Sequence, residues 1–154
     1  MSMINASAGT VERMLSENGS YASVTAGVSM RPLFKTHRDV VILESVTERL
    51  KKYDVALYRI NGKYILHRVI AIDEARGMYI IRGDNTFHKE YVPFDVVIAR
   101  LTAFNRKGKH STVDSTAYRV YARIWNFIFP IRCVFRAPLT ISSRIYNKLK
   151  NAKK

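Results

Sequence analysis

The sequence predicts a mainly β fold, an antiparallel and partly closed β-sheet domain with a short N-terminal helix and C-terminal basic amphipathic helices. Two observations support this prediction. Between residues 39 and 104, segments rich in β-branched or alternating apolar residues follow one another and are separated by turn-forming residues. From Ala117 onward the apolar residues repeat at helical spacing, and the charge becomes strongly positive.

The first expected element is a short helix over residues 10–19. Val11, Met14 and Leu15 repeat there at helical spacing, and an Asn-Gly pair ends the pattern. Residues 20–27 are small and polar, with some extended character.

About five strands joined by hairpins are expected next. They lie at residues 39–44, 54–60, 63–72, 78–82 and 95–104. The Asn61-Gly62 pair between the second and third is the strongest hairpin signal in the chain, because both residues tolerate the positive φ of a tight two-residue turn. Consecutive hairpins favour an antiparallel sheet.

The C-terminal third is expected to be helical. Residues 117–128 place their apolar side chains on one helical face, and Pro130 and Pro138 are expected to break this pattern. Apolar residues then recur every fourth position over residues 141–149, with lysines and arginines beside them. Both segments have the pattern of basic amphipathic helices.

Length and composition limit the functional classes. The chain has 154 residues, enough for one domain and an appendage, and 47% of them are hydrophobic, so a disordered chain is excluded. Cys133 is the single cysteine, which excludes an intramolecular disulfide framework and multi-cysteine zinc or iron–sulfur sites. No cofactor and no metal are expected.

The charge divides the chain into parts. Residues 1–105 hold 14 lysines and arginines against 11 acidic residues, whereas residues 106–154 hold 12 against the single Asp114. We therefore expect an N-terminal helix and lead-in at 1–26, a β domain at 27–105 and a basic helical tail at 106–154. Such a tail favours an anionic partner, either a membrane surface, nucleic acid or an acidic protein.

The sequence predicts neither a signal peptide nor a transmembrane helix. The first 20 residues contain no continuous apolar stretch, and the most apolar later run, 124–134, is short and interrupted by Pro130. The expected location is cytoplasmic, with peripheral membrane association through the tail as an extension of that expectation.

Three short segments contain residue types that carry chemistry. In the first, Gly27 and Pro32 flank Ser29 and favour a sharp turn that exposes a hydroxyl near backbone N–H groups. The second is the His67-Arg68 pair within an expected strand, where histidine can take a proton near neutral pH. The third is Gly83-Asp84-Asn85, which reads as a plain turn or as the source of a carboxylate that orients His67.

Taken together and in this order, the three segments resemble the signal peptidase I family and, more broadly, the serine peptidases that include the self-cleaving LexA-type repressors. Ser29-Met30-Arg31-Pro32 is similar to the family's nucleophile box, and His67-Arg68-Val69-Ile70 to the histidine version of its base box. Gly83-Asp84-Asn85 matches the third box, and Glu90 stands where these enzymes often have a second aspartate.

The resemblance covers about residues 27–101 and has three departures. Signal peptidases normally have a membrane anchor before the serine box, and no such segment precedes it here. Val28 precedes the serine where they usually have glycine, and Gly27 stands where many have a serine that assists the oxyanion hole. Glu90 replaces an aspartate.

The resemblance implies a serine endopeptidase that cleaves a peptide or precursor protein. Ser29 would attack the carbonyl, His67 would act as general base, and Asp84 would hold His67 or shape its loop. Supporting roles are expected for a set of neighbouring residues, namely Glu90, Gly27, Met30 and Arg68. Lys63 is a less favoured base, because it lies next to the hairpin turn.

The alternative function is non-enzymatic: a peptidase-like β domain that uses its basic tail to bind an anionic membrane surface or nucleic acid. The tail's aromatic residues and arginines are typical of an interfacial helix, and no recognised nucleic-acid-binding spacing is present. The sequence therefore favours the membrane surface over nucleic acid. Beyond a peptide or protein substrate, it does not name a partner.

Overall fold

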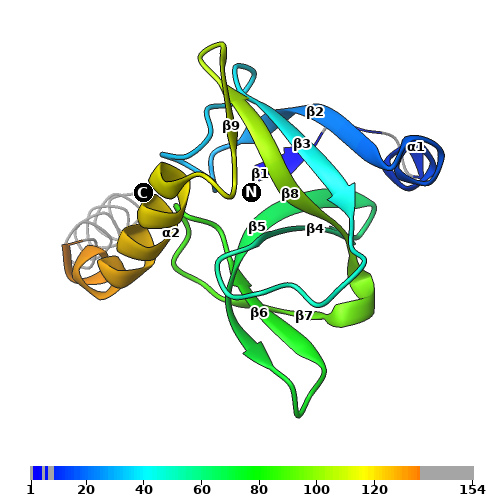
Figure 1. Cartoon of the computed structure of the whole chain (residues 1–154). Helices are drawn as coiled ribbons and strands as arrows, with labels where there is room; N and C mark the ends of the chain where they lie inside the picture. Colours follow the sequence, from blue (N-terminus) through cyan, green and yellow to red (C-terminus); the bar gives the residue numbers. More distant parts are fainter. Residues whose placement is uncertain (1, 5, 7–8, 136–154) are drawn as a thin grey trace, which may run out of the picture.

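The computed structural model describes residues 2–4, 6 and 9–135, and within them the chain forms one antiparallel sheet flanked by helices (Figure 1). The described elements, in chain order, are β1 (Ser2–Ile4), α1 (Thr10–Asn18), β2 (Ser20–Gly27), β3 (Val40–Ser45), β4 (Val55–Ile60), β5 (Lys63–Asp73), β6 (Met78–Arg82), β7 (Glu90–Pro93), a 3-10 turn η1 (Phe94–Val96), β8 (Val97–Arg106), β9 (Lys109–Thr112) and α2 (Thr116–Phe127). The predicted mainly β fold is confirmed.

The sheet is curled and partly closed, as the sequence predicts. Its strands follow the order β1-β2-β3-β8-β4-β5-β6-β7, with β9 paired to β8. The short strand β1 also pairs with β5 through Met3↔Ile65 and Ile4↔Tyr64, which brings distant parts of the sheet together. Residues 2–27 thus contribute β1 and β2 to the same sheet as the β domain expected at 27–105.

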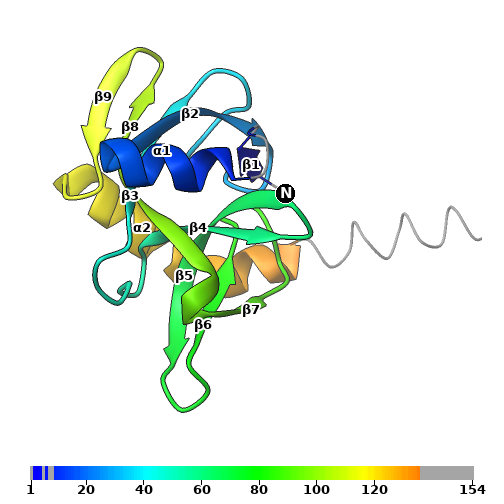
Figure 2. The same cartoon turned by 90° about the vertical axis from the view of Figure 1, so that its right-hand side faces the viewer.

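Two apolar clusters stabilise the sheet. The first joins α1, β3, β8 and the start of α2, and includes Met30 and Tyr118. The second lies between β4, β5, β6 and β7, and includes Tyr58 and Val69. Figure 2 shows β5 and β6 projecting together away from the part of the sheet that α1 covers. Strand β5 contributes residues to both clusters, so side chains on either face of β5 are held in place by packed apolar residues.

The C-terminal helical region is interrupted next to Pro130, as the sequence predicts. Helix α2 begins after Ser115, whose side chain accepts a hydrogen bond from the backbone N–H of Tyr118. Helix α2 ends at Phe127, the chain turns at Ile128, and a second helical segment covers residues 129–135, with Pro130 in its first turn. A proline is tolerated there because a first helical turn leaves its N–H groups without intrahelical partners. The helix expected at 141–149 lies outside the described residues.

Helices α1 and α2 lie on opposite sides of the fold (Figure 1), and both pack on the first apolar cluster. Each places apolar residues against the sheet, Val11 and Leu15 from α1 and Tyr118 and Ala122 from α2. Within the described residues, none of the helices has both the length and the apolar character needed to cross a bilayer.

Candidate active site

The three segments singled out in the sequence meet in the fold. Ser29 follows the end of β2, His67 lies on β5, and Gly83-Asp84-Asn85 follows the end of β6. The Ser29 Oγ lies 2.6 Å from Nε2 of His67, a hydrogen bond between two buried side chains. A hydroxyl that donates to an imidazole nitrogen at this distance has the geometry of a nucleophile with its general base.

The serine turn depends on a glycine and on core packing. Gly27 has a φ of 86°, in the left-handed region that a residue without Cβ adopts at little cost, and it turns the chain out of β2. Met30, directly after Ser29, is completely buried in the first apolar cluster. The backbone N–H of Asn85 donates to the Ser29 carbonyl at 2.6 Å, which fixes the serine turn against the following loop.

Gly83 is required by close approach rather than by its backbone angle. A Cβ at this position would lie 2.9 Å from His67 Nε2, 2.9 Å from Ser29 Cβ and 2.8 Å from the Ser29 carbonyl oxygen. Any side chain there would displace the serine, the histidine or both. The glycine of the third segment therefore lies directly against the Ser29–His67 pair.

His67 and Arg68 are adjacent on β5 but serve opposite sides of the strand. Successive side chains of a strand point to opposite faces. His67 faces Ser29, and Arg68 faces Asp84 and α2. Both are completely buried, because residues 64–69 are covered on both faces. This alternation explains why a His-Arg pair can supply a base on one face and a structural cation on the other.

The sequence leaves two roles open for Asp84, holding His67 or shaping its loop, and its contacts agree with the second. Its carboxylate accepts two hydrogen bonds from Arg68, at 2.8 and 2.7 Å, and one from the Tyr121 hydroxyl at 3.0 Å. These bonds direct it toward Arg68 and α2 on the face of β5 opposite His67. Burial acts to lower the pKa of Arg68, but the Asp84 carboxylate and the Tyr118 hydroxyl together outweigh it and raise the pKa. Asp84 therefore shapes the loop and does not contact the histidine.

Glu90 occupies the position beside the histidine. Its Oε1 lies 3.2 Å from Nδ1 of His67, and its Oε2 accepts a 2.5 Å hydrogen bond from the hydroxyl of Tyr58. The contact with His67, together with the Tyr58 bond, lowers the pKa of Glu90 to about 2 despite partial burial. The carboxylate is therefore charged at neutral pH and can stabilise a positive charge on His67.

Tyr58 completes the surroundings of His67. Its hydroxyl lies 3.2 Å from Nδ1 of His67 while it donates to Glu90. Burial, and then the hydrogen bond to Glu90, raise the pKa of Tyr58, so the hydroxyl stays neutral. Because its proton goes to Glu90, its oxygen can accept from Nδ1–H. This favours the tautomer whose Nε2 is free to accept from Ser29.

The sequence reasoning missed Tyr58, although its signal was present. A two-residue Asn61-Gly62 turn fixes the register of the hairpin, which pairs Tyr58 with Ile65 and Ala56 with His67. Tyr58 and His67 are therefore diagonal neighbours on the same face of the sheet. Carrying the turn geometry one step further would have identified the contact.

Other residues considered as candidates lie farther away or at the edge. Lys63 begins β5 and is exposed, four residues from His67 along an extended strand, or about 13 Å. His88 is exposed, with its Nε2 3.5 Å from Glu90 Oε1. Among the described residues, no group of three or more histidine, cysteine or acidic side chains is arranged to hold a metal ion.

An open groove lies beside the serine turn. It has a volume of about 530 Å³ and is lined by Arg31, Pro32, Asn85, Phe87, Trp125, Arg132 and Phe135. These residues come from the serine turn, from the loop after β6 and from the C-terminal helix. The groove therefore borders the serine turn, while Ser29 itself is buried beneath the surface and is not among its lining residues.

No protein-family model matches the chain, and no curated protein sequence matches it. The functional interpretation therefore rests on the geometry of Ser29, His67 and Glu90 and on the three sequence segments that supply them.

Proposed function

We propose that the protein is a serine endopeptidase, similar to signal peptidases, that uses Ser29 as nucleophile and His67 as general base. The observation that carries this proposal is the 2.6 Å contact between Ser29 Oγ and His67 Nε2, with the Glu90 carboxylate 3.2 Å from Nδ1 of the same ring. A nucleophile, a base and an acidic group that orients the base are the three parts that acyl transfer needs.

In the proposed reaction the Ser29 oxygen attacks the peptide carbonyl as its proton passes to His67 Nε2. Glu90 stabilises the resulting imidazolium from the Nδ1 side, and Tyr58 holds the ring in place. His67 then donates the proton to the leaving amine, which breaks the peptide bond and leaves an acyl-enzyme. A water molecule, deprotonated by His67, releases the acyl group and regenerates Ser29.

The burial of Ser29 favours the second candidate, a non-enzymatic peptidase-like module that binds an anionic surface through its tail. Ser29 is 1% exposed, so a peptide carbonyl reaches its oxygen only when the serine turn and the loop after β6 move apart. In a purely structural domain, the same Ser29–His67 hydrogen bond would simply satisfy two buried polar groups.

A fluorophosphonate probe, which reacts with activated serines, distinguishes the two candidates. The proposal predicts labelling of the wild-type protein and none of Ser29→Ala or His67→Ala. Ser23→Ala and His110→Ala are controls, because the half-buried Ser23 hydroxyl donates to the carbonyl of Val24 and the exposed His110 ring lies 3.0 Å from the Asn105 side chain, so neither bond involves the site. Labelling that is equal in wild type, Ser29→Ala and His67→Ala would exclude the proposed mechanism, and so would no labelling of folded wild type.

A further inference from the structure

The C-terminal helical region carries an unusual row of exposed apolar side chains. Six of the ten large hydrophobic residues that are exposed in the described part of the chain lie here, and we call them the helix stripe: Val120, Ile124, Phe127, Ile131, Val134 and Phe135. Their spacing of four, three, four and three residues keeps the first five on one side of a helix. Phe127 is 82% exposed and Phe135 is 74% exposed. A contiguous row of such side chains marks an interaction surface, whereas single exposed apolar residues need no explanation.

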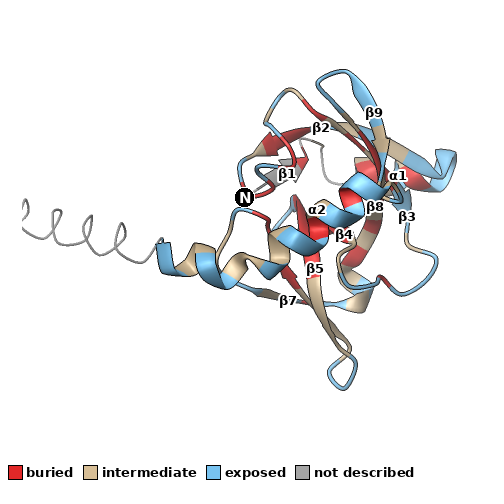
Figure 3. Cartoon of the chain, turned by 60° about the vertical axis from the view of Figure 1, so that its left-hand side comes forward, coloured by how far each residue is buried: buried red, intermediate tan, exposed pale blue. Residues whose placement is uncertain are grey.

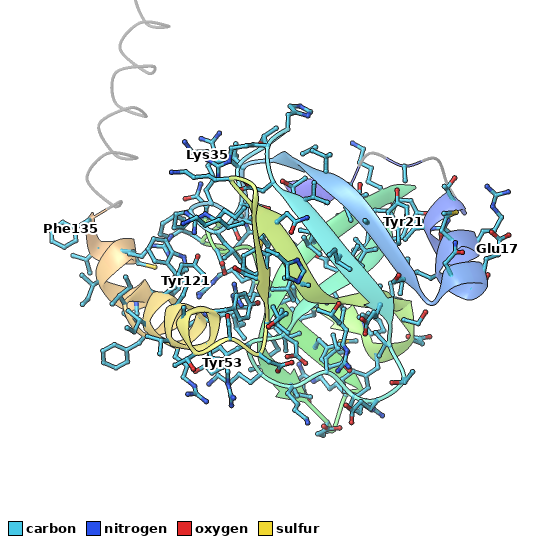
Figure 4. The ribbon with its side chains drawn as sticks, turned by 45° about the horizontal axis from the view of Figure 1, so that its top comes forward. Glu17, Tyr21, Lys35, Tyr53, Tyr121 and Phe135 are labelled. Atoms are coloured by element: carbon cyan, nitrogen blue, oxygen red, sulfur yellow. The ribbon has the colours of Figure 1, made fainter. Side chains whose placement is uncertain are left out.

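The opposite side of this helix is fixed to the body of the protein. The Tyr118 hydroxyl accepts a hydrogen bond from Arg68, the Tyr121 hydroxyl donates to Asp84, and the Trp125 indole donates to the Asp84 carbonyl at 2.8 Å. Figure 4 shows Tyr121 between the helix and the sheet, and Phe135 projecting outward at the end of the described helix. The helix is thus held in an orientation that presents the stripe to solvent, as the exposed residues in Figure 3 indicate.

The charge beside the stripe is positive. Arg119 and Arg123 are exposed on the same helix, and α2 itself contains no acidic residue. Across residues 106–154, 12 lysines and arginines stand against the single Asp114. Exposed apolar side chains flanked by arginines match the chemistry of a bilayer surface with anionic headgroups.

We infer that the helix stripe docks the protein on an anionic membrane, with its apolar side chains entering the interface and Arg119 and Arg123 meeting the headgroups. A second copy of the chain fits less well, because stripe-to-stripe packing would bring the flanking arginines of both copies together. Nucleic acid fits less well too, because the phosphate backbone pairs with the cations and leaves the exposed aliphatic side chains in water.

The docked orientation would place the groove beside Ser29 near the lipid surface. Phe135 belongs both to the stripe and to the groove, and Trp125 lines the groove from the same helix. If the proposed peptidase function holds, docking would bring a substrate that emerges from a membrane close to this groove. Membrane docking itself does not depend on peptidase activity, so it is tested in the Ser29→Ala protein.

The experiment measures co-sedimentation of the full chain with phosphatidylcholine vesicles that contain or lack phosphatidylglycerol. We expect binding to the anionic vesicles at low salt, weakening as salt is added. The double variant Phe127→Ser/Ile131→Ser should lose at least about tenfold in binding, and Arg119→Ala or Arg123→Ala about fivefold each.

Matched controls come from exposed residues outside the helix. Tyr91→Ser and Ile60→Ser remove exposed apolar side chains on β7 and β4, and Lys109→Ala removes a cation on β9, so each should leave binding unchanged. The inference is overturned by the absence of binding to anionic vesicles at low salt, or by undiminished binding of Phe127→Ser/Ile131→Ser. It is also overturned by tighter binding to single-stranded RNA, or by self-association that this double variant abolishes.

Discussion

Gly83→Ala tests how closely the third segment supports the nucleophile. The added methyl group would lie 2.9 Å from His67 Nε2 and 2.9 Å from Ser29 Cβ, whereas ordinary contacts are 3.4–4 Å. Either side chain, or the loop itself, must therefore move by at least about 0.5 Å. Such a movement would stretch the 2.6 Å Ser29–His67 hydrogen bond to the upper end of its normal range.

We expect Gly83→Ala to lower the rate of fluorophosphonate labelling by about 10- to 100-fold, because misplacing reacting groups by about 1 Å costs about 10²-fold. Gly62→Ala is the matched control. It also changes a glycine, on the hairpin that carries His67, but its Cβ would meet nothing within 4 Å. Its φ of 75° makes it a test of backbone strain alone. The reasoning is refuted if folded Gly83→Ala labels as fast as wild type, or if Gly62→Ala loses as much as Gly83→Ala.

Three further predictions concern the groups around the site. Glu90→Gln keeps the shape of the side chain but removes its charge, and it should slow fluorophosphonate labelling by about 10³-fold. Tyr58→Phe should slow it by about tenfold. Equal labelling of wild type and both variants would contradict the orienting roles of Glu90 and Tyr58. Because the folded pKa of Glu90 is about 2, below its ordinary value of 4.5, its contribution to stability is fully present above about pH 4.5 and is lost as the pH falls toward 2. Urea unfolding should therefore show a steeper loss of stability over this range in wild type than in Glu90→Gln, and parallel curves would argue against it. Asp84→Asn leaves the buried Arg68 without its counter-charge and should cost about 3–5 kcal/mol. Asp73→Asn, whose partner Arg76 is exposed, should cost less than about 1 kcal/mol, and similar melting temperatures for the two variants would contradict this.

The main lines of the fold follow from local sequence signals. The Asn61-Gly62 turn and the apolar segments around it predict β4, β5, β6 and β8, and the spacing from Ala117 predicts α2. The short strands are harder to predict, because β1, β7 and β9 have three or four residues each. Segments of that length carry too little periodicity to be recognised, and they are strands only because a neighbour offers hydrogen bonds.

The contacts within the candidate site are predicted only in part by the sequence. The order of the three segments predicts that Ser29 and His67 meet, but not which carboxylate faces the imidazole. That choice depends on the face of β5 that each side chain occupies and on the path of the loop between Asp84 and Glu90. Asp84 pairs with Arg68 on the face of β5 opposite His67, whereas Glu90, at the start of β7, lies against His67. Neither contact is local in sequence, so spacing alone cannot distinguish them.

The docking of α2 on the site also arises from tertiary structure. Sequence periodicity identifies the buried face of the helix, but the partners of that face, Arg68 and Asp84, come from distant strands. The same contacts explain why the apolar residues on the other face remain exposed. A helix that is fixed through hydrogen bonds on one side cannot rotate to bury the other.

Ser29, activated by His67, is proposed to cleave peptide bonds. The most direct test incubates the full-length protein with a mixture of synthetic peptides and identifies new internal termini by mass spectrometry. The proposal predicts products from wild type that are lost in both Ser29→Ala and His67→Ala but retained in Ser23→Ala. Cleavage that persists in Ser29→Ala would contradict the proposal, and so would no cleavage of any peptide by a wild-type protein that the probe labels.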